Sequence, residues 1–342
     1  CGMRRNAHGW ILNNKKTILL VGCNGYIGSR FVEQFHDRYN IAGIDTNFFG
    51  NDHEIVSKLK FFLKKDIREI EVNELPKIDY AVHMGELSND PLGELDPNIT
   101  KDINHNGTIK LYSLLKMTNV EKFVYMSSCS VYGFNKQIVN EDSKVNPLTE
   151  YAKAKIDNED FLLNNDSNFQ IKIFRNATAF GFSPNVRLDL VINELVYKAV
   201  KDKKINLLSN GLQNRPFVHI DDINNLVVKS LEENEDKKLL VNVGQNNLNF
   251  SIIEIAEIIA KITNLKNIEI NEKNPDSRSY FVDFSKLQKI FPEYRFQYNI
   301  PDGISNLIKN YDDFEINENS IRLTKIKKLI KNSDLSNDLK WN

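Results

Sequence analysis

Short apolar runs alternate, along the first half of the chain, with longer segments whose apolar residues recur at helical spacing. The run Thr-Ile-Leu-Leu-Val at residues 17–21 is typical of a strand that is buried on both faces. Similar runs follow at residues 41–44, 59–63, 79–83, 122–126, 171–174 and 239–243. The segments between them favour helices. This alternation predicts an α/β fold of the Rossmann type, a doubly wound parallel sheet.

The pattern becomes less regular after about residue 177, where prolines and glycines separate short predicted elements. We place a smaller C-terminal α/β substrate domain in that part of the chain. The predicted boundaries are 15–176 and 216–244 for the Rossmann domain, and 177–215 and 245–314 for the substrate domain. Residues 1–14 are interpreted as a tag or leader, and residues 315–342 as a helical tail.

The first apolar run leads directly into a turn that contains Gly22, Gly25 and Gly28, and a predicted helix follows. Glycines allow the backbone to turn tightly and to approach a pyrophosphate, which then lies on the helix N-terminus. The next predicted strand ends at Asp45, about twenty residues beyond the first glycine, where a ribose-binding acid is expected. Because a carboxylate there accepts hydrogen bonds from ribose hydroxyls and repels a 2′-phosphate, we predict NAD as the cofactor.

A tyrosine and a lysine lie one helical turn apart, at Tyr151 and Lys155. A lysine cation at this distance lowers the pKa of the phenol, which makes Tyr151 a candidate acid/base for a substrate hydroxyl or carbonyl. The pattern on its own is weak, and an ordinary amphipathic helix start is the competing interpretation. The predicted strand at 122–126 is followed by Ser128, a hydroxyl donor at the carboxyl end of the sheet.

Acidic and basic residues nearly cancel, with 46 of the former and 45 of the latter. We therefore expect neither nucleic acid nor an anionic membrane surface as a partner. The three cysteines are far apart, which suits a reducing cytoplasm, and no Cys/His cluster has metal-ligand spacing. We predict no metal site.

Taken together, these residues resemble the extended short-chain dehydrogenases/reductases, and in particular the NAD-dependent nucleotide-sugar epimerase/dehydratase family. The resemblance runs from about residue 16 to residue 310. Its motifs are Gly22-x-x-Gly25-x-x-Gly28, Asp45, Asp66, His83-Met-Gly85, Asn104-x-x-Gly107-Thr108, Ser128, Tyr151-x-x-x-Lys155 and Arg215-Pro-Phe-Val-His219.

The resemblance implies a role for each matching position. Tyr151 would be the acid/base, Lys155 would hold the nicotinamide ribose, and Ser128 would share the hydrogen bond to the reacting sugar oxygen. The implied cofactor-binding residues are Gly22, Gly25, Tyr26, Ile27, Gly28, Asp45, Asp66, Ile67, Met84, Tyr151 and Lys155. The implied substrate-binding residues are Glu86, Ser88, Ser130, Thr178, Arg187, Asn193, Arg215 and Arg278. A nucleotide sugar is thus the implied substrate, and a homodimer the implied assembly.

Two of these positions have an equally ordinary explanation. Asp66 is a candidate contact of the adenine and also a candidate N-cap of the next helix. Arg278 is expected either to bind a substrate phosphate, together with Arg215, or to form a surface salt bridge.

Several positions depart from the best-known members of the family. Cys129 and Ser130 stand where 4,6-dehydratases carry the Asp and Glu that remove a proton and expel water. Cys129 is either a catalytic thiol or a small buried residue. Glu86 replaces a small residue beside the nicotinamide, and three interpretations are open: a favourable charge, an extra acid/base, or a solvated loop carboxylate. Thr178 replaces an asparagine, which weakens the substrate contact predicted there.

The sequence therefore predicts an enzyme that oxidises C4 of a nucleotide-linked sugar by hydride transfer to bound NAD. A 4-epimerase or a 4-dehydrogenase fits the missing Asp–Glu pair. The alternatives are an unusual dehydratase that uses Cys129 or Glu86, a reductase of small alcohols or ketones, and a catalytically silent NAD-binding regulatory protein. Retention of Ser128, Tyr151 and Lys155 counts against the silent protein, and Arg215 with Arg278 counts against a small neutral substrate.

Overall fold

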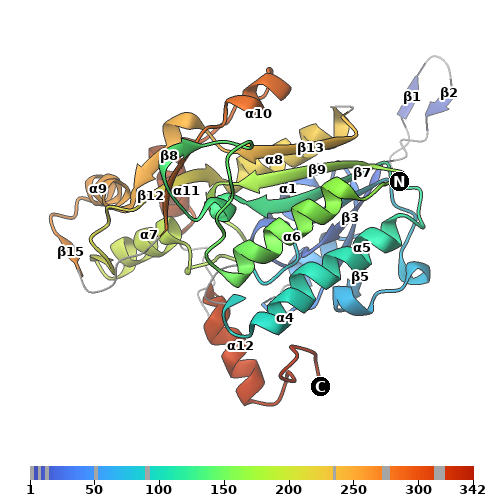
Figure 1. Cartoon of the computed structure of the whole chain (residues 1–342), viewed down its shortest axis with the longest axis horizontal. Coiled ribbons are helices and arrows are strands. Elements are labelled where there is room, and N and C mark those ends of the chain that lie inside the picture. The colour runs from blue at the N-terminus through green and yellow to red at the C-terminus, as the bar shows by residue number, and fades with distance from the viewer. Residues whose placement is uncertain are drawn as a thin grey trace.

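A seven-stranded parallel sheet forms the centre of the computed structural model, which describes residues 4–6, 9–11, 15–49, 53–88, 93–233, 236–271, 278–311 and 320–342 (Figure 1). The strand order is β13-β9-β7-β6-β3-β4-β5. The strands are β3 (Thr17–Val21), β4 (Asn40–Asp45), β5 (Phe61–Lys64), β6 (Tyr80–His83), β7 (Lys122–Ser128), β9 (Gln170–Asn176) and β13 (Lys238–Val243). The chain order reverses between β3 and β6, which is where ligands bind in doubly wound sheets. The predicted fold class is confirmed.

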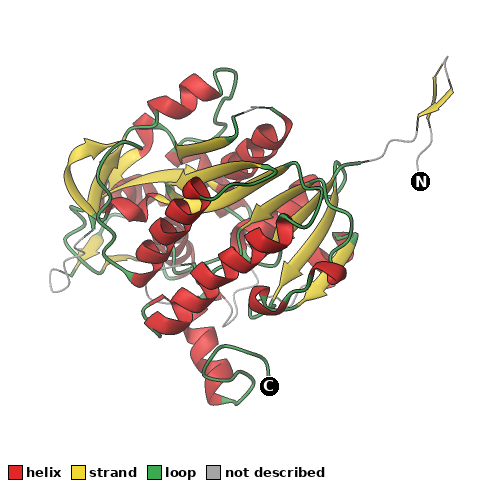
Figure 2. Ribbon diagram, turned by 45° about the vertical axis from the view of Figure 1, so that its right-hand side comes forward, coloured by secondary structure: helices red, strands yellow, loops and turns green. Residues whose placement is uncertain are grey.

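Helices cover both faces of this sheet (Figure 2). Ile18 and Leu20 of β3 pack in one core cluster with residues of α1 (Tyr26–Phe35) and α8 (Ile220–Glu232). Leu19 and Val21 belong to another cluster, with residues of α5 (Gly107–Leu115) and α6 (Glu150–Asn164). Successive strand side chains point to opposite faces, so a strand that is buried on both sides has to be apolar at every position. This requirement explains the continuous apolar runs in the sequence.

The long helical segment predicted at 96–119 is divided by one wide turn. It consists of α4 (Pro97–Lys101), the π-helical turn η3 (Asp102–Asn106) and α5. Asn104 lies in the wide turn, is fully buried, and exchanges hydrogen bonds of 2.8 and 3.1 Å with the backbone N–H and C=O of Leu87. Wide turns of this kind occur frequently at functional sites. Here the turn fixes the backbone next to Glu86.

A second group of smaller elements has its own apolar core, built by α7 (Val191–Lys201), α9 (Ile252–Thr263) and α11 (Ile300–Lys309). Short sheets accompany these helices. They are formed by β10 (Thr178–Phe180), β12 (Asn214–His219) and β14 (Asn249–Ser251), by β11 (Ile205–Leu207) and β15 (Ile268–Ile270), and by β8 (Phe134–Val139) and β16 (Ser279–Val282). The predicted domain boundaries themselves stay a prediction.

The remaining short elements lie before, between and after these units. They are β1 (Arg4–Asn6), β2 (Gly9–Ile11), α2 (His53–Lys58), η1 (Ile67–Glu69), η2 (Val72–Glu74), η4 (Cys129–Tyr132), η5 (Asn246–Leu248), α10 (Ser285–Ile290) and α12 (Arg322–Lys331). β1 and β2 pair as an antiparallel hairpin. α12 supplies the helix predicted for the C-terminal tail, and residues 315–319 of that tail lie outside the described part.

The tail packs against the carboxyl edge of the sheet, below α4 in Figure 1. Ile326, Leu329, Leu335 and Leu339 are buried in one cluster with residues of the main body. The body contributes Phe48, Leu87 and Ile103 to this cluster. Within the described residues, no helix is both long and apolar enough to cross a membrane.

Candidate active site

A pocket of about 690 Å³ opens at the carboxyl ends of the central strands. It is lined both by residues of the large sheet and by residues of the smaller group of elements. Among the residues predicted to form the site, all except Cys129 and Asn193 line it. A volume of this size is in the range of small-molecule binding sites.

The turn between β3 and α1 accepts only glycine at its tightest points. Gly22 has φ +86°, and a Cβ added there would lie 2.6 Å from the backbone nitrogen of Gly85. A Cβ on Gly28 would lie 2.0 Å from the carbonyl oxygen of Gly22. Gly25 is the N-cap of α1 and has no side chain to satisfy the first N–H groups of the helix. The turn therefore fits a dinucleotide pyrophosphate, as the sequence predicted.

Asp45 and Asp66 both line the pocket. Asp45 accepts hydrogen bonds from the backbone N–H groups of Asn24 (2.9 Å) and Asn47 (2.7 Å), and burial raises the pKa of its carboxyl. Asp66 is the N-cap of η1 and forms an ion pair with Arg68 at 2.6 Å. The N-cap interpretation of Asp66 is confirmed, and its position in the pocket keeps the adenine contact as a prediction.

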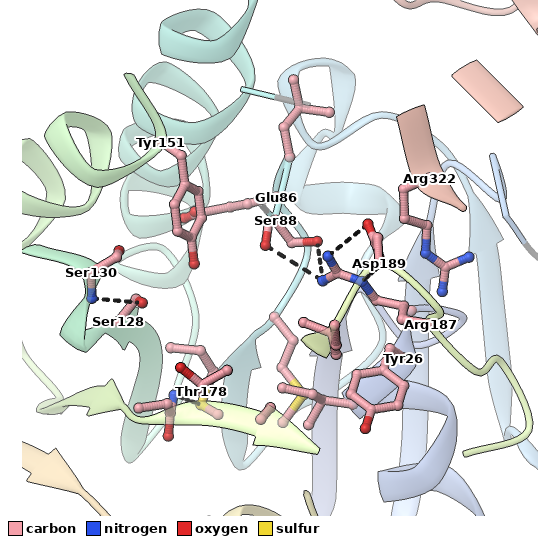
Figure 3. Close-up of a pocket in the computed structure, with 18 of the residues that line it drawn as sticks. Tyr26, Glu86, Ser88, Ser128, Ser130, Tyr151, Thr178, Arg187, Asp189 and Arg322 are labelled. Atoms are coloured by element: carbon pink, nitrogen blue, oxygen red, sulfur yellow. Dashed lines mark hydrogen bonds and ion pairs between the residues drawn. The ribbon is translucent and has the colours of Figure 1, made fainter. Parts of the chain in front are cut away.

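Ser128, Tyr151 and Lys155 converge on one side of the pocket. Ser128 ends β7, and its Oγ accepts a hydrogen bond of 3.1 Å from the backbone N–H of Ser130. α6 begins with Thr149 as its N-cap, so Tyr151 and Lys155 fall on its first turns. The ammonium of Lys155 lies 5.5 Å from the ring centre of Tyr151. Figure 3 shows Tyr151 and Ser128 facing the same open space.

Lys155 is buried, and its charge is held by a carboxylate. Its Nζ lies 2.7 Å from Oε2 of Glu86, and the side chains of the two residues are 5 % and 3 % exposed. Burial lowers the pKa of Lys155, but the negative charges of Glu86 and of ionised Tyr151 outweigh this effect, so the net shift is upward. Lys155 therefore remains a cation beside the phenol.

Glu86 is also held from its other side. Its Oε1 accepts a hydrogen bond of 2.8 Å from the hydroxyl of Tyr125, which in turn accepts one of 2.8 Å from the amide of Asn158. A carboxylate with these partners is not solvated, so the interpretation of Glu86 as a loop charge in water is wrong. Its position next to Lys155 makes it the counter-ion of the lysine.

Cys129 points away from the pocket. Its thiol is buried and donates to the carbonyl oxygen of Arg175 at 3.2 Å, and burial raises the pKa of the thiol. A thiol in this environment is not readily ionised. These observations favour the packing role over the catalytic role that the sequence left open.

Asn193 does not line the pocket but supports residues that do. Its side-chain amide donates to the hydroxyl of Tyr26 and to the carbonyl oxygen of Arg187, both at 3.1 Å. Its Oδ1 accepts from the backbone N–H of Gly181. The structure thus gives Asn193 a positioning role, whereas the sequence predicted direct contact with the substrate.

Arginines lie at two places around the pocket. Arg215 is buried and donates to the backbone oxygen of Arg278, which brings these two predicted phosphate-binding residues together. Arg187 donates to Oγ of Ser88 at 3.0 Å and makes a two-point contact with Asp189 at 2.9 and 3.1 Å (Figure 3). Thr178 and Ser130 complete the polar lining near Tyr151.

Sequence reasoning missed several charged residues that line the pocket, among them Asp189 and Arg322. The sequence could have indicated Asp189, because it follows the predicted site residue Arg187 by two positions in the same loop. Arg322 had no such signal, because it belongs to a lysine-rich helix at the end of the chain, and its place at the pocket depends on the path of the whole chain. The described residues contain no group of three or more His, Cys, Asp or Glu side chains placed to hold a metal ion.

The Glu86–Lys155 pair should contribute strongly to stability. Glu86→Ala leaves a buried ammonium without its carboxylate, so we expect the free energy of unfolding to fall by about 3–5 kcal/mol. The double variant Glu86→Ala/Lys155→Met should lose less free energy of unfolding than the sum of the losses in the two single variants. Urea unfolding of the unmodified protein, the two single variants and the double variant measures this difference, which is the coupling energy of the pair.

The exposed pair Glu150–Lys153 on the same helix, with atoms 2.6 Å apart, is the matched control. Because solvent screens this exposed pair, its coupling should be much smaller than that of the buried pair. Equal coupling in the two pairs would mean that burial does not increase the contribution of the Glu86–Lys155 ion pair to stability.

Comparison with known proteins agrees with this geometry. The family model described as "NAD dependent epimerase/dehydratase family" matches residues 18–244. The UDP-glucuronate 4-epimerase of Thermodesulfobacterium geofontis is 25 % identical over 313 residues, which cover 85 % of this chain and 94 % of that protein.

Solved structures show the same fold. UDP-glucuronic acid 4-epimerase from Bacillus cereus, in complex with UDP-glucuronic acid and NAD, superposes with a TM-score of 0.74 at 24 % identity, covering 86 % of this chain and 100 % of that one. The NAD-dependent NDP-hexosamine 5,6-dehydratase TunA superposes with a TM-score of 0.78 at 20 % identity, covering 88 % and 99 %. The chain therefore belongs to the NAD-dependent epimerase/dehydratase family, and NAD is its cofactor.

Proposed function

We propose that the protein is a nucleotide-sugar 4-epimerase. The observation that carries this proposal is the convergence of Ser128, Tyr151 and Lys155 on one pocket that also contains the glycine turn. Such a set is suited to reversible oxidation of a secondary alcohol, because it combines a proton acceptor with a dinucleotide site.

In the proposed reaction, Oη of ionised Tyr151 takes the proton from the C4 hydroxyl of the sugar. Lys155 favours the phenolate through its charge, and the Ser128 hydroxyl donates a hydrogen bond to the reacting oxygen. NAD, when bound, supplies the acceptor and later the donor of the hydride that leaves and re-enters C4. Return of the hydride to the opposite face, with return of the proton from Tyr151, inverts C4 and restores every group.

Epimerisation is favoured over dehydration because elimination requires a further acid and base. This chain has Cys129 and Ser130 at the two positions where, according to the family resemblance, 4,6-dehydratases carry the acidic pair Asp and Glu. The Cys129 thiol bonds a backbone carbonyl, and Glu86 forms an ion pair with Lys155. Neither group is thus available for proton transfer at a neighbouring sugar carbon. The names of the relatives, which include both 4-epimerases and dehydratases, are compatible with this choice.

A nucleoside diphosphate fits the far part of the pocket. Arg215 and Arg278 both line it, and the guanidinium of Arg215 is buried against the ring of Tyr280, 5.5 Å from its centre. Guanidinium groups bind phosphate oxygens through two parallel hydrogen bonds, which supports the predicted contact with the diphosphate of a nucleotide sugar.

The homodimer and the cytoplasmic location predicted from the sequence remain proposals. The family resemblance suggests a dimer built on the helices within residues 103–117 and 151–163. In these two ranges, Met117 is the large apolar side chain that the structure leaves exposed. A dimer built there would therefore rely chiefly on polar and partly buried side chains.

The function is tested by incubating the protein with UDP-glucose, UDP-glucuronate or UDP-N-acetylglucosamine and identifying products by NMR. We expect inversion at C4 of one of these sugars, without accumulation of reduced cofactor. Tyr151→Phe should keep NAD binding but lower turnover by about 10²–10⁴-fold, because proton transfer is lost. Accumulation of a keto sugar with reduced cofactor would instead identify a 4-dehydrogenase, and an unsaturated or deoxy product would identify a dehydratase.

Cys129→Ala separates the two roles of the thiol. Since the thiol is buried and bonded to a backbone carbonyl, we expect the same product at an unchanged rate, measured by the same NMR assay. Cys129→Ser serves as the conservative partner, because it keeps a small polar group at the site. Loss of turnover in the alanine protein, with its NAD affinity and melting temperature unchanged, would restore the catalytic role.

Asp45→Ala should relax the preference for NAD over NADP. Without the carboxylate, a 2′-phosphate is no longer repelled, and the ratio of the two dissociation constants should move toward NADP by about tenfold or more. Calorimetric titration with both cofactors measures the ratio. Asp37→Ala, which removes a carboxylate that is 96 % exposed, is the charge-matched control and should leave the ratio unchanged.

A further inference from the structure

We infer that the C-terminal segment, residues 320–342, forms one wall of the NAD pocket and that Arg322 binds the cofactor's pyrophosphate. The inference concerns the binding of NAD and is independent of the reaction proposed above. It starts from the position of Arg322, the first residue of α12, which lines the pocket although only 2 % of its surface is exposed.

Arg322 is linked to the glycine turn through one intermediate residue. Its Nη2 donates to the backbone oxygen of Asn185 at 3.1 Å, and the side chain of Asn185 donates to the backbone oxygen of Asn24 at 2.7 Å. Asn24 lies in the turn itself, between Gly22 and Gly25. These two hydrogen bonds link the guanidinium of Arg322, through Asn185, to the glycine turn that precedes α1.

Figure 3 shows on which side of the pocket Arg322 lies. Its guanidinium is near Arg187 and on the same side as Tyr26, whereas Tyr151 and Ser128 lie on the opposite side. Tyr26 is the first residue of α1, where the N–H groups bind a pyrophosphate. Arg322 is thus at the phosphate end of the cofactor site and away from the reactive end.

The charges around Arg322 are suited to an added anion. Burial, and then the charge of Arg187, lower the pKa of Arg322 to about 9, and the carboxylates of Asp189 and Asp45 offset part of this shift. Asp189 already makes a two-point contact with Arg187, and both oxygens of Asp45 accept from backbone N–H groups. A pyrophosphate bound at the glycine turn would accept charge-assisted hydrogen bonds from guanidinium N–H groups on this side of the pocket.

The same C-terminal segment also contacts the loops that carry the two acids of the cofactor site. Trp341 donates from Nε1 to the backbone oxygen of Thr46 at 2.7 Å, next to Asp45. Arg68, which pairs with Asp66, donates to the backbone oxygen of Asp338 at 3.0 Å. The segment therefore restrains the backbone that follows Asp45 and the side chain that holds Asp66.

Apolar packing fixes the segment in this position. Ile326, Leu329, Leu335 and Leu339 are buried against the body, and the Trp341 ring lies 5.7 Å from that of Phe48. Burial of four aliphatic side chains on a folded body is strongly favourable, so the segment is an integral part of the fold and holds Arg322 at the pocket. The adenosine half of NAD would then be enclosed between the sheet and the tail, which slows its release.

Binding of cofactor fragments tests the role of Arg322. Calorimetric titrations of Arg322→Gln with NAD, ADP-ribose and ADP should show affinities about 10- to 100-fold weaker than those of the unmodified protein. Adenosine, which has no phosphate, should bind equally to both proteins. UDP, a probe of the substrate's diphosphate, should also be unaffected, because Arg215 and Arg278 lie elsewhere in the pocket.

Lys327→Gln is the matched control, because it removes one exposed positive charge from the same helix and should change none of these affinities. Unchanged binding of ADP by Arg322→Gln would overturn the assignment. Equal weakening of adenosine binding would also overturn it, since the substitution would then act through the structure and not through the phosphates. Weaker binding of UDP with unchanged binding of ADP would assign Arg322 to the substrate's diphosphate and would overturn the inference as well.

A measurement on the unmodified protein keeps the inference testable even if Arg322→Gln fails to fold. ADP-ribose should slow hydrogen–deuterium exchange of backbone amides in residues 320–342 as well as in the glycine turn. Adenosine should protect the tail less than ADP-ribose does. Protection confined to the glycine turn would show that the tail is not part of the cofactor site.

Discussion

The buried ammonium of Lys155 is the constraint on which the active site depends. A charge of this kind is costly to bury unless a counter-ion and hydrogen-bond acceptors surround it. Glu86 and the backbone oxygen of Met126 supply these partners, and Tyr125 and Asn158 complete the shell around Glu86. The wide turn at Asn104 belongs to the same arrangement, because its side chain holds the backbone just after Glu86. The helix irregularity and the ion pair thus have one structural explanation.

The parallel sheet explains why chemically different groups meet in one pocket. The carboxyl ends of β3, β4 and β7 lie at the same edge, so the glycine turn, Asp45 and Ser128 converge although they are far apart in sequence. Helix α6 packs on one face of the sheet and brings Tyr151 to this edge. The sheet therefore positions both the cofactor and the reacting hydroxyl, and local loops adjust the contacts.

Three buried arginines, Arg187, Arg215 and Arg322, line the pocket from different parts of the chain. Two phosphate-bearing ligands, a dinucleotide and a nucleotide sugar, have to occupy neighbouring parts of this space. Arg322 belongs to the end near the glycine turn and Arg215 to the end near Tyr280. This separation of positive charge offers a physical means of keeping the two pyrophosphates apart.

The sequence by itself determined the parallel sheet, the glycine turn, Asp45 and the Tyr151–Lys155 pair. Each depends on a local property: continuous apolar runs, the need for glycine at a positive φ, or the one-turn spacing of a helix. It also identified Ser128 and several other polar residues that line the pocket, through resemblance to a family whose motifs are local in the chain.

Only the tertiary structure decided which side chains these residues contact. It made Glu86 the counter-ion of Lys155, turned Cys129 and Asn193 away from the pocket, and brought Arg322 into the pocket lining. These contacts join segments that are far apart in the chain. They depend on the packing of helices and loops against the sheet, which no local pattern of residues records.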